Sequence, residues 1–194
     1  MITSLPDASE LPECDFEGWR SWFVGAARAV LDWVPPKGVA IFFQSDVLRQ
    51  GVWVDKAFLV MSGAEGSGAE LVWHKIVCRT PPGSLSVGRA GYSHLLCFSR
   101  SPRPAFRHPF PDVVSDGGFK ASEKAMGEEA CLLACRFLLA ATETRTVVDP
   151  FCGQGTVLAA ANALGLDAIG VDRSVRACRA ARRRQKLDAP CDSD

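Results

Sequence analysis

The residues best suited to chemistry lie in segment 147–156. Two valines run into Asp149, and Gly153 and Gly155 then form a short turn before an apolar helical run. Glycine can adopt positive φ angles and lets backbone N–H groups approach a ligand closely, and the following helix N-terminus favours a carboxylate or phosphate. Asp172 ends the next apolar run, about 20 residues after the turn, where an acid can accept hydrogen bonds from ribose hydroxyls. The segment therefore predicts a strand, a turn and a helix that bind a nucleotide-type ligand.

This segment resembles motif I of the class I S-adenosylmethionine (SAM)-dependent methyltransferases. It is similar to the version found in enzymes that methylate exocyclic amines of nucleic-acid bases, which implies SAM as the cofactor. A dinucleotide dehydrogenase would carry a third glycine near the helix start, and position 158 is Leu. The alternative is an ordinary strand–turn–helix unit without a cofactor. The expected cofactor-binding residues are Asp149, Pro150, Phe151, Cys152, Gly153, Gly155, Thr156 and Asp172.

The resemblance extends along nearly the whole chain to a circularly permuted class of DNA amino-methyltransferases, in which the catalytic strand precedes the cofactor strand. It implies that the catalytic motif closes the first strand, at Ser4-Leu5-Pro6-Asp7. The family pattern is Asp, Asn or Ser, then Pro, Pro and an aromatic residue. Ser4 and Pro6 fit this pattern, whereas Leu5 departs mildly and Asp7 stands where the aromatic residue would stack on the target base. Ser4, Pro6 and Asp7 are therefore the expected catalytic residues.

The chemistry of amine methylation explains this motif. The lone pair of an exocyclic amine is delocalised into its ring, so the amine is a poor nucleophile. Hydrogen bonds accepted by the Ser4 hydroxyl and the Leu5 carbonyl would concentrate charge on nitrogen in the transition state, and Pro6 would keep the turn rigid. Asp7 is either a further acceptor for the amine proton or a carboxylate that caps a helix. No metal is needed.

Apolar patterning places these residues on a sheet edge. The fold expected is a three-layer α/β/α Rossmann-like SAM methyltransferase sheet, circularly permuted because the cofactor strand comes last, with about six main strands. The first strand and the cofactor strand should be adjacent and parallel, which brings Ser4 near Asp149. Strands are expected at 1–3, 39–43, 70–77, 93–98, 147–149 and 168–171, and helices at 16–33, 55–63, 123–140, 157–164 and from 174.

The chain is expected to form a single domain. Its expected parts are a catalytic half at 1–99, an irregular connector or recognition segment at 100–122, a SAM-binding half at 123–187 and a tail at 188–194. Residues 44–54 are expected to be a polar loop.

Several other polar and aromatic residues have two readings. Asp46, Asp55 and Lys56 lie at the carboxyl edge of the sheet, where ligands bind, or in a solvated loop. One of His74 and Lys75 could face the active edge, although structural roles are more common. The aromatic residues that could replace the missing stacking residue are Trp53, Trp73 and Tyr92, with a core position favoured for Trp73.

Basic residues gather in two segments, where they could contact phosphates or form solvated faces. The first group is Arg100, Arg103, Arg107 and His108, and the second is Arg173, Arg176, Arg179, Arg182, Arg183, Arg184 and Lys186.

Composition sets the outer limits. The chain has 194 residues, with 22 Lys plus Arg and 22 Asp plus Glu, so global charge predicts no polyanion partner. None of the eight cysteines forms a Cys-x-x-Cys pair, which favours reduced thiols. No apolar run reaches transmembrane length and no signal pattern begins the sequence, so we expect a cytoplasmic protein that does not associate with membranes.

The function expected is SAM-dependent methylation of an exocyclic amine of a nucleic-acid base. RNA is favoured over DNA because the segments available for recognition are short. One alternative is a catalytically silent methyltransferase-like subunit that binds a protein partner or RNA, suggested by Asp7. Another is a methyltransferase acting on a protein or small molecule.

Overall fold

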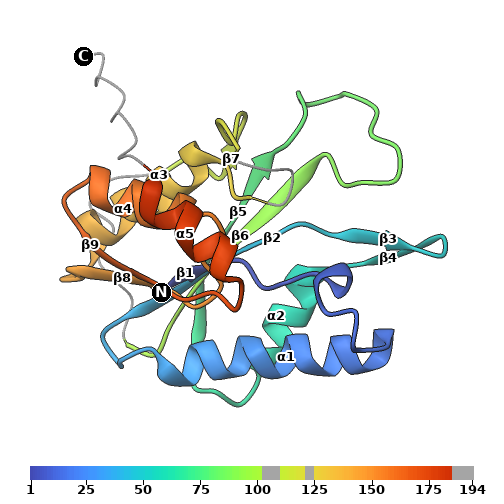
Figure 1. Ribbon diagram of the computed structural model, residues 1–194, viewed down its shortest axis with the longest axis horizontal. Helices are drawn as coiled ribbons and strands as arrows, with labels where there is room; N and C mark the ends of the chain where they lie inside the picture. Colours follow the sequence, from blue (N-terminus) through green and yellow to red (C-terminus); the bar gives the residue numbers. More distant parts are fainter. Residues whose placement is uncertain (102–109, 121–124, 185–194) are drawn as a thin grey trace.

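The computed structural model describes residues 1–101, 110–120 and 125–184, and it places helices on both faces of a central sheet (Figure 1). Helices α1 and α2 cover one face, and α3 and α4 cover the other. The three-layer α/β/α class expected from the sequence is thereby confirmed. The helices are α1 (Phe16–Trp33), α2 (Lys56–Ala64), α3 (Glu128–Ala141), α4 (Thr156–Ala163) and α5 (Val175–Arg183), with a 3₁₀ turn, η1, at Ala8–Glu10.

The sheet contains parallel and antiparallel strands. Five strands lie in the spatial order β1-β2-β6-β5-β7, with β6 antiparallel to both β2 and β5, and β8 and β9 form a separate parallel pair. Their bounds are β1 (Ile2–Thr3), β2 (Val39–Gln44), β5 (Glu70–Cys78), β6 (Tyr92–Ser99), β7 (Val113–Val114), β8 (Thr146–Asp149) and β9 (Asp167–Gly170). All six strands expected from the sequence are present, and β7 is an additional short one.

Strand β2 shows why the central strands are apolar throughout. Ile41 and Phe43 face the core formed with α3 and α4, whereas Ala40 and Phe42 face the core formed with α1 and α2. Successive side chains of a strand point to opposite faces, so a strand covered on both sides needs an unbroken apolar run. This arrangement fixes the two helical layers around the sheet.

The first strand, β1, and the strand before the glycine turn, β8, meet in the middle of the fold. Thr3 Oγ1 of β1 donates a hydrogen bond of 2.7 Å to Asp149 Oδ1 of β8, so these strands are neighbours as expected. Among the described residues, backbone ladders join β1 to β2 and β8 to β9, and side chains join β1 to β8. The circular permutation stays a prediction.

The segment after β2 differs from the expectation of a loop. Residues 47–54 form a hairpin of β3 (Val47–Arg49) and β4 (Val52–Val54), closed by Gln50 and Gly51 with φ angles of 50° and 78°. Two consecutive positive φ angles suit the tight turns of two-residue hairpins, so apolar residues on both sides of a Gln-Gly pair were the missed signal.

The expected boundaries at 122/123 and 187/188 fall on residues that the structure does not describe. Helix α3 begins at Glu128 rather than 123, and residues 121–124 and the tail at 188–194 are not described. No helix in the described part of the chain is long and apolar enough to cross a membrane.

Candidate active site

The glycine turn between β8 and α4 has the conformation that its sequence requires. Gly153 and Gly155 have φ angles of 49° and 80°, a region that residues with a Cβ rarely adopt. A Cβ on Gly155 would lie 2.8 Å from the Cβ of Ala181 in α5, whereas one on Gly153 would meet nothing within 4 Å. Gly155 therefore lets α5 pack on the turn, and Gly153 leaves its backbone open to a ligand.

Asp172, just beyond β9, holds this turn in place. Its Oδ2 accepts a hydrogen bond of 2.9 Å from the Gly153 N–H, and its Oδ1 accepts one of 2.7 Å from the Ser174 N–H. Each carboxylate oxygen has a second lone pair, so both can still accept a ligand hydroxyl. The geometry is compatible with the ribose-binding role that the sequence predicts.

Asp149 is a buried carboxyl group rather than a surface ligand. It accepts hydrogen bonds from Thr3 Oγ1 and from the Phe151 N–H, at 2.7 Å and 3.1 Å. Burial raises the pKa of Asp149 to about 6, although these two hydrogen bonds act in the opposite direction. Asp149 thus ties the cofactor turn to β1, the strand that leads into Ser4.

A cavity of about 930 Å³ opens beside the turn. Ser4 and Pro6 line it, and so do seven of the eight residues expected to bind the cofactor, Gly155 being the exception. The sequence did not reveal Trp22 of α1, whose ring meets that of Phe151 edge-on with centroids 5.9 Å apart. The helical periodicity of residues 16–33 predicts only that Trp22 lies on the apolar face of its helix. Nothing in the neighbouring sequence predicts that it lines this cavity.

The groups around this cavity suit SAM. Glu10, Glu13 and Asp172 bring carboxylates to a ligand with cationic amino and sulfonium groups, and Trp22 and Phe151 offer apolar surface. Arg173 also lines the cavity, but it is paired, because it donates to Glu13 Oε1 at 3.0 Å and to the Glu10 carbonyl. Carboxylates therefore outnumber cationic side chains in the described lining.

A second cavity of about 300 Å³ adjoins the first. Ser4, Leu5, Glu10 and Ala125 line both cavities, so segment 4–7 separates them. A ligand pocket of this size is at the lower end of the usual range. Its other lining residues include Asp7, Phe43, Asp46, Lys56, Arg79, Arg89 and Lys120.

Segment 4–7 is held by contacts with α1 and α2. Leu5 is buried in the core formed with α1 and α2, and the Trp19 indole donates a hydrogen bond of 3.1 Å to the Pro6 carbonyl. Asp7 caps η1 and also accepts from the ammonium group of Lys56, a residue only 3% exposed. Asp7 therefore has a cap role and an ion pair, and its side chain lines the second cavity.

Asp46 and Lys56 are buried, so the reading of both as solvated loop residues is wrong. Asp46 Oδ1 accepts from the Lys56 N–H at 2.9 Å, and its Oδ2 lies 3.1 Å from His94 Nε2. His94 Nδ1 lies 2.9 Å from His74 Nε2, which continues the chain of polar groups. Burial would raise the pKa of Asp46, but the hydrogen bonds from His94 and Lys56 hold it below its usual value.

The same groups are the described candidates for metal ligands. Ligand atoms of Asp46, Asp55 and His94 lie within 4.8 Å of one another. The Asp46–His94 hydrogen bond occupies two of them, and Asp55 caps α2 by accepting from the Phe58 N–H at 2.9 Å. We therefore interpret the cluster as a hydrogen-bond network.

The three candidates for the stacking aromatic lie in different places. Trp73 packs edge-on against Phe137 of α3, with centroids 5.2 Å apart, at the border of the core. The Tyr92 hydroxyl lies 3.4 Å from Asp46, and Trp53 is 51% exposed on β4. The aromatic residue that lines the second cavity is Phe43 of β2, which the sequence reading counted only as a core residue.

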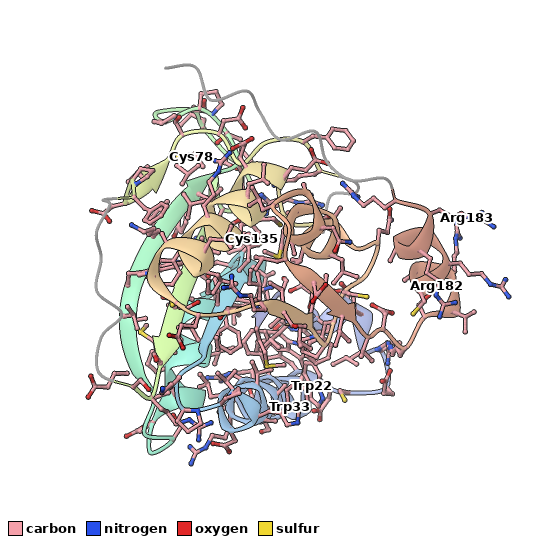
Figure 2. All side chains as sticks on the ribbon, turned by 90° about the vertical axis from the view of Figure 1, so that its left-hand side faces the viewer. Trp22, Trp33, Cys78, Cys135, Arg182 and Arg183 are labelled. Carbon is pink, nitrogen blue, oxygen red and sulfur yellow. The ribbon has the colours of Figure 1, made fainter. Side chains whose placement is uncertain are left out.

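The two basic groups also have structural contacts. Arg100 donates to the carbonyls of Leu31, Asp32 and Val34 at the end of α1, and Arg184 pairs with Glu128 at 2.7 Å. The rest of the first group, Arg103, Arg107 and His108, and Lys186 of the second lie outside the described residues. Arg182 and Arg183 project from α5 at the edge of the molecule (Figure 2), and neither lines one of the two cavities.

The cysteines in the core are inert thiols. Cys131 and Cys135 lie inside α3, where burial raises their pKa values, that of Cys135 to about 12 (Figure 2). Cys152 lines the cofactor cavity, and burial raises its pKa to about 11. These thiols are protonated at neutral pH, so they act as apolar packing groups.

Comparisons with known proteins agree with this site. A family model described as DNA methylase (N6_N4_Mtase) matches residues 132–183, which include the glycine turn and Asp172. No curated protein sequence matches the chain.

Solved structures with the same fold include a putative DNA modification methylase, TTHA0409, from Thermus thermophilus. It is 18% identical with a TM-score of 0.73, over 97% of this chain and 87% of that one. The PvuII cytosine-N4-specific DNA methyltransferase is 15% identical with a TM-score of 0.70, over 93% of this chain and 77% of that one. TTHA0409 has also been solved in complex with SAM, with 19% identity and a TM-score of 0.70 over 93% of this chain and 82% of that one.

The resemblance expected from the residues is thereby confirmed. The cofactor half, residues 132–183, matches the N6/N4 DNA methylase family model, and the chain has the fold of the solved DNA methylases.

Proposed function

We propose that this protein transfers a methyl group from SAM to an exocyclic amine of adenine or cytosine in a nucleic acid. The observation that carries the proposal is the pair of adjoining cavities that share Ser4 and Leu5. The larger would hold SAM against the glycine turn, and the smaller would hold the target base. An extruded base is the form in which enzymes reach such an amine.

The residues of this chain would position and activate the amine. Bound SAM supplies a methyl group on a positively charged sulfur. Ser4 would accept a hydrogen bond from the amine, and the Leu5 carbonyl could accept another. As the new nitrogen–carbon bond forms and the sulfur–carbon bond breaks, the amine nitrogen becomes positive and then releases a proton to water or a nearby carboxylate.

Asp7 gives this site a different base-binding surface from one with a stacking aromatic. Its pairing with Lys56 keeps an ion pair at the wall of the second cavity. Phe43, Leu5 and Val47 supply apolar contacts in the same cavity. We propose that these three side chains contact the base in place of an aromatic residue at position 7.

The similar solved structures are titled DNA methylases, so DNA is the first substrate to test. The preference for RNA rested on short recognition segments alone, and the comparisons lend it no support. A catalytically silent subunit remains the second candidate, because the Asp7–Lys56 ion pair occupies the place of the stacking residue.

The test is methyl transfer from tritiated SAM to unmethylated DNA, total RNA and a protein extract, with the wild type and Ser4→Ala. We expect label in nucleic acid as N6-methyladenine or N4-methylcytosine, and a 10²- to 10³-fold loss of turnover in Ser4→Ala, roughly as for removal of one transition-state hydrogen bond. SAM binding by calorimetry should be unchanged in the variant. SAM binding without label in any substrate would favour the silent subunit, and label in protein alone would refute the proposal.

A further inference from the structure

The β3–β4 hairpin and the loop at 79–91 form an exposed apolar surface, which we call the hairpin–loop face. The hairpin extends away from the helical layers at one end of the molecule, with the loop on the same side (Figure 1). A backbone bridge between Val47 and Arg89 joins the two segments. The face is defined as residues 47–54 and 79–91.

Apolar side chains on this face are unusually exposed. Trp53 is 51% exposed and Val52 66%, while Leu85 and Val87 of the loop are 98% and 96% exposed. Leu48 adds a fifth apolar side chain, at 40%. Single exposed apolar residues are normal, but a cluster on projecting segments indicates an interaction surface.

The charge of this face indicates what kind of partner it fits. Its residues include Arg49, Arg79 and Arg89 and no Asp or Glu, although acids and bases balance over the whole chain at 22 each. Arginines at the edge of an apolar surface suit a polyanion that also has flat apolar faces. Nucleic acid has both, because its phosphates attract the guanidinium groups and its bases stack on aromatic rings.

The face is continuous with the second cavity. Val47 and Leu48 of the hairpin and Gly88 and Arg89 of the loop line that cavity together with Ser4. A nucleotide whose base enters the cavity must leave its neighbours along the rim, since the sugar–phosphate backbone connects them covalently. The hairpin–loop face contributes Val47, Leu48, Gly88 and Arg89 to the lining of the cavity that Ser4 also lines, so it is the surface along which the neighbouring nucleotides would run.

We propose that the hairpin–loop face binds the strand that flanks the target nucleotide. Trp53 stacks on a neighbouring base, its cross-strand partner Leu48 fills the space left in the base stack, and Arg49 and Arg89 contact phosphates. Proteins that combine basic side chains with inserted apolar wedges partly unstack and kink a duplex. The proposal rests on the proposed function, since it requires a nucleic-acid substrate.

The test measures binding of a fluorescein-labelled single-stranded oligodeoxynucleotide of about 12 nucleotides, within the usual site size of single-strand binders, by anisotropy in the presence of S-adenosylhomocysteine. Trp53→Ala should weaken binding by about tenfold or more, the usual effect of removing one base-stacking aromatic. Trp33→Ala is the matched control, because Trp33, the last residue of α1, is 68% exposed and should change affinity less than twofold. Figure 2 labels its position.

Charge is tested separately with the double variant Arg49→Gln/Arg89→Gln. Loss of two phosphate contacts should make the slope of log K against log salt shallower by about 1.4. The matched control is Arg182→Gln/Arg183→Gln on α5, which should leave the slope unchanged. Circular dichroism and SAM calorimetry check that each variant folds and keeps its cofactor site.

Two results would overturn the inference and separate it from the proposed function. If the wild type methylates nucleic acid but the face variants bind and turn over like the controls, the function stands and the face is not its docking surface. If sedimentation shows a dimer that Trp53→Ala dissociates, the face joins two copies of the chain. A wild type that neither binds nor methylates nucleic acid refutes both proposals.

Discussion

At the scale of single residues, each acid at the site has a different task, set by its surroundings. Asp149 is buried, and burial raises its pKa. Asp172 fixes a turn by accepting two backbone hydrogen bonds, and Asp7 forms an ion pair with Lys56. The sequence offers three similar carboxyl groups, and only their partners distinguish them. Asp149 and Asp172 both line the cofactor cavity, and of these two Asp172 is the one that is only partly buried.

The first prediction concerns the affinity for SAM. Asp172→Asn should raise the Kd of SAM by on the order of 10- to 100-fold, because a charge-assisted hydrogen bond contributes about 1.5–3 kcal/mol. The amide also replaces one of the two acceptors that hold the turn. Isothermal titration calorimetry measures the change.

Asp167→Asn is the control for this prediction. Asp167 is exposed at the opposite end of the same strand, where its N–H donates to the Arg145 carbonyl at 2.9 Å. Its substitution should leave the Kd within twofold. Equal affinities of the two variants would remove Asp172 from the cofactor site.

At the scale of elements, the glycine turn depends on the helix that packs on it. Gly155 begins α4 in a left-handed conformation, and Ala181 of α5 lies against its α-carbon. The close approach of α5 to the turn therefore requires both a small side chain at position 181 and no side chain at position 155. Gly165, just after α4, has a similar φ of 77° but open space around it.

The second prediction uses this contrast. Gly155→Ala should destabilise the protein by about 2–5 kcal/mol, from a left-handed alanine at about 1–2 kcal/mol and from overpacking at about 1–3 kcal/mol. Gly165→Ala should destabilise the protein only by the cost of a left-handed alanine, about 1–2 kcal/mol, because no atom lies near its Cβ position. Urea unfolding monitored by circular dichroism gives both values.

A second substitution isolates the steric part. Adding Ala181→Gly to Gly155→Ala should recover stability relative to Gly155→Ala, after correction for the single Ala181→Gly change in a helix. Absence of coupling in this double-mutant cycle would mean that α5 does not pack on the turn as described.

At the scale of the whole molecule, one hydrogen bond joins the first strand to the cofactor strand. Thr3 and Asp149 are 146 positions apart in sequence, and the hydrogen bond between them is 2.7 Å long. Segment 4–7 and the glycine turn both follow directly from these strands. Burial of Asp149 at this junction therefore links the ionisation of one group to the stability of the whole fold.

The third prediction is the pH dependence of that stability. The pKa of Asp149 is about 6 in the folded state against 3.8 as the reference value, so the folded state holds the proton more tightly. The stabilisation is complete below about pH 4 and is lost as pH rises through about 6, a total of about 3 kcal/mol at about 1.4 kcal/mol per pKa unit.

Asp149→Asn lacks this ionisation and supplies the comparison. The difference in free energy of unfolding, wild type minus variant, should fall by about 3 kcal/mol between about pH 4 and pH 7, since the other carboxyl groups cancel. Urea titrations across this pH range measure it. A difference that does not vary with pH would show that Asp149 is not a buried, proton-binding group.

Local sequence determined the elements of this protein. The unbroken apolar run at 39–43, the helical period at 16–33 and the glycine turn at 153–155 are properties of neighbouring residues, and each element is where it was expected. The turn also carried the resemblance to SAM-dependent methyltransferases, because its chemistry lies within one short run of consecutive residues. The hairpin at 47–54 was equally local, and it was missed because its Gln-Gly turn was read as part of a polar loop.

Only the tertiary structure decided which side chains share a site. Lys56 pairs with Asp7, and His94 lies between Asp46 and His74. These residues belong to different elements far apart in the sequence, so the periodicity of hydrophobic residues could not predict that they meet. The two cavities exist because β1 and β8 lie side by side and place segment 4–7 next to the glycine turn. The pattern of apolar residues in the sequence determines which face of a helix or strand is buried. The packing of elements that are distant in sequence determines which polar side chains meet at the ends of the strands.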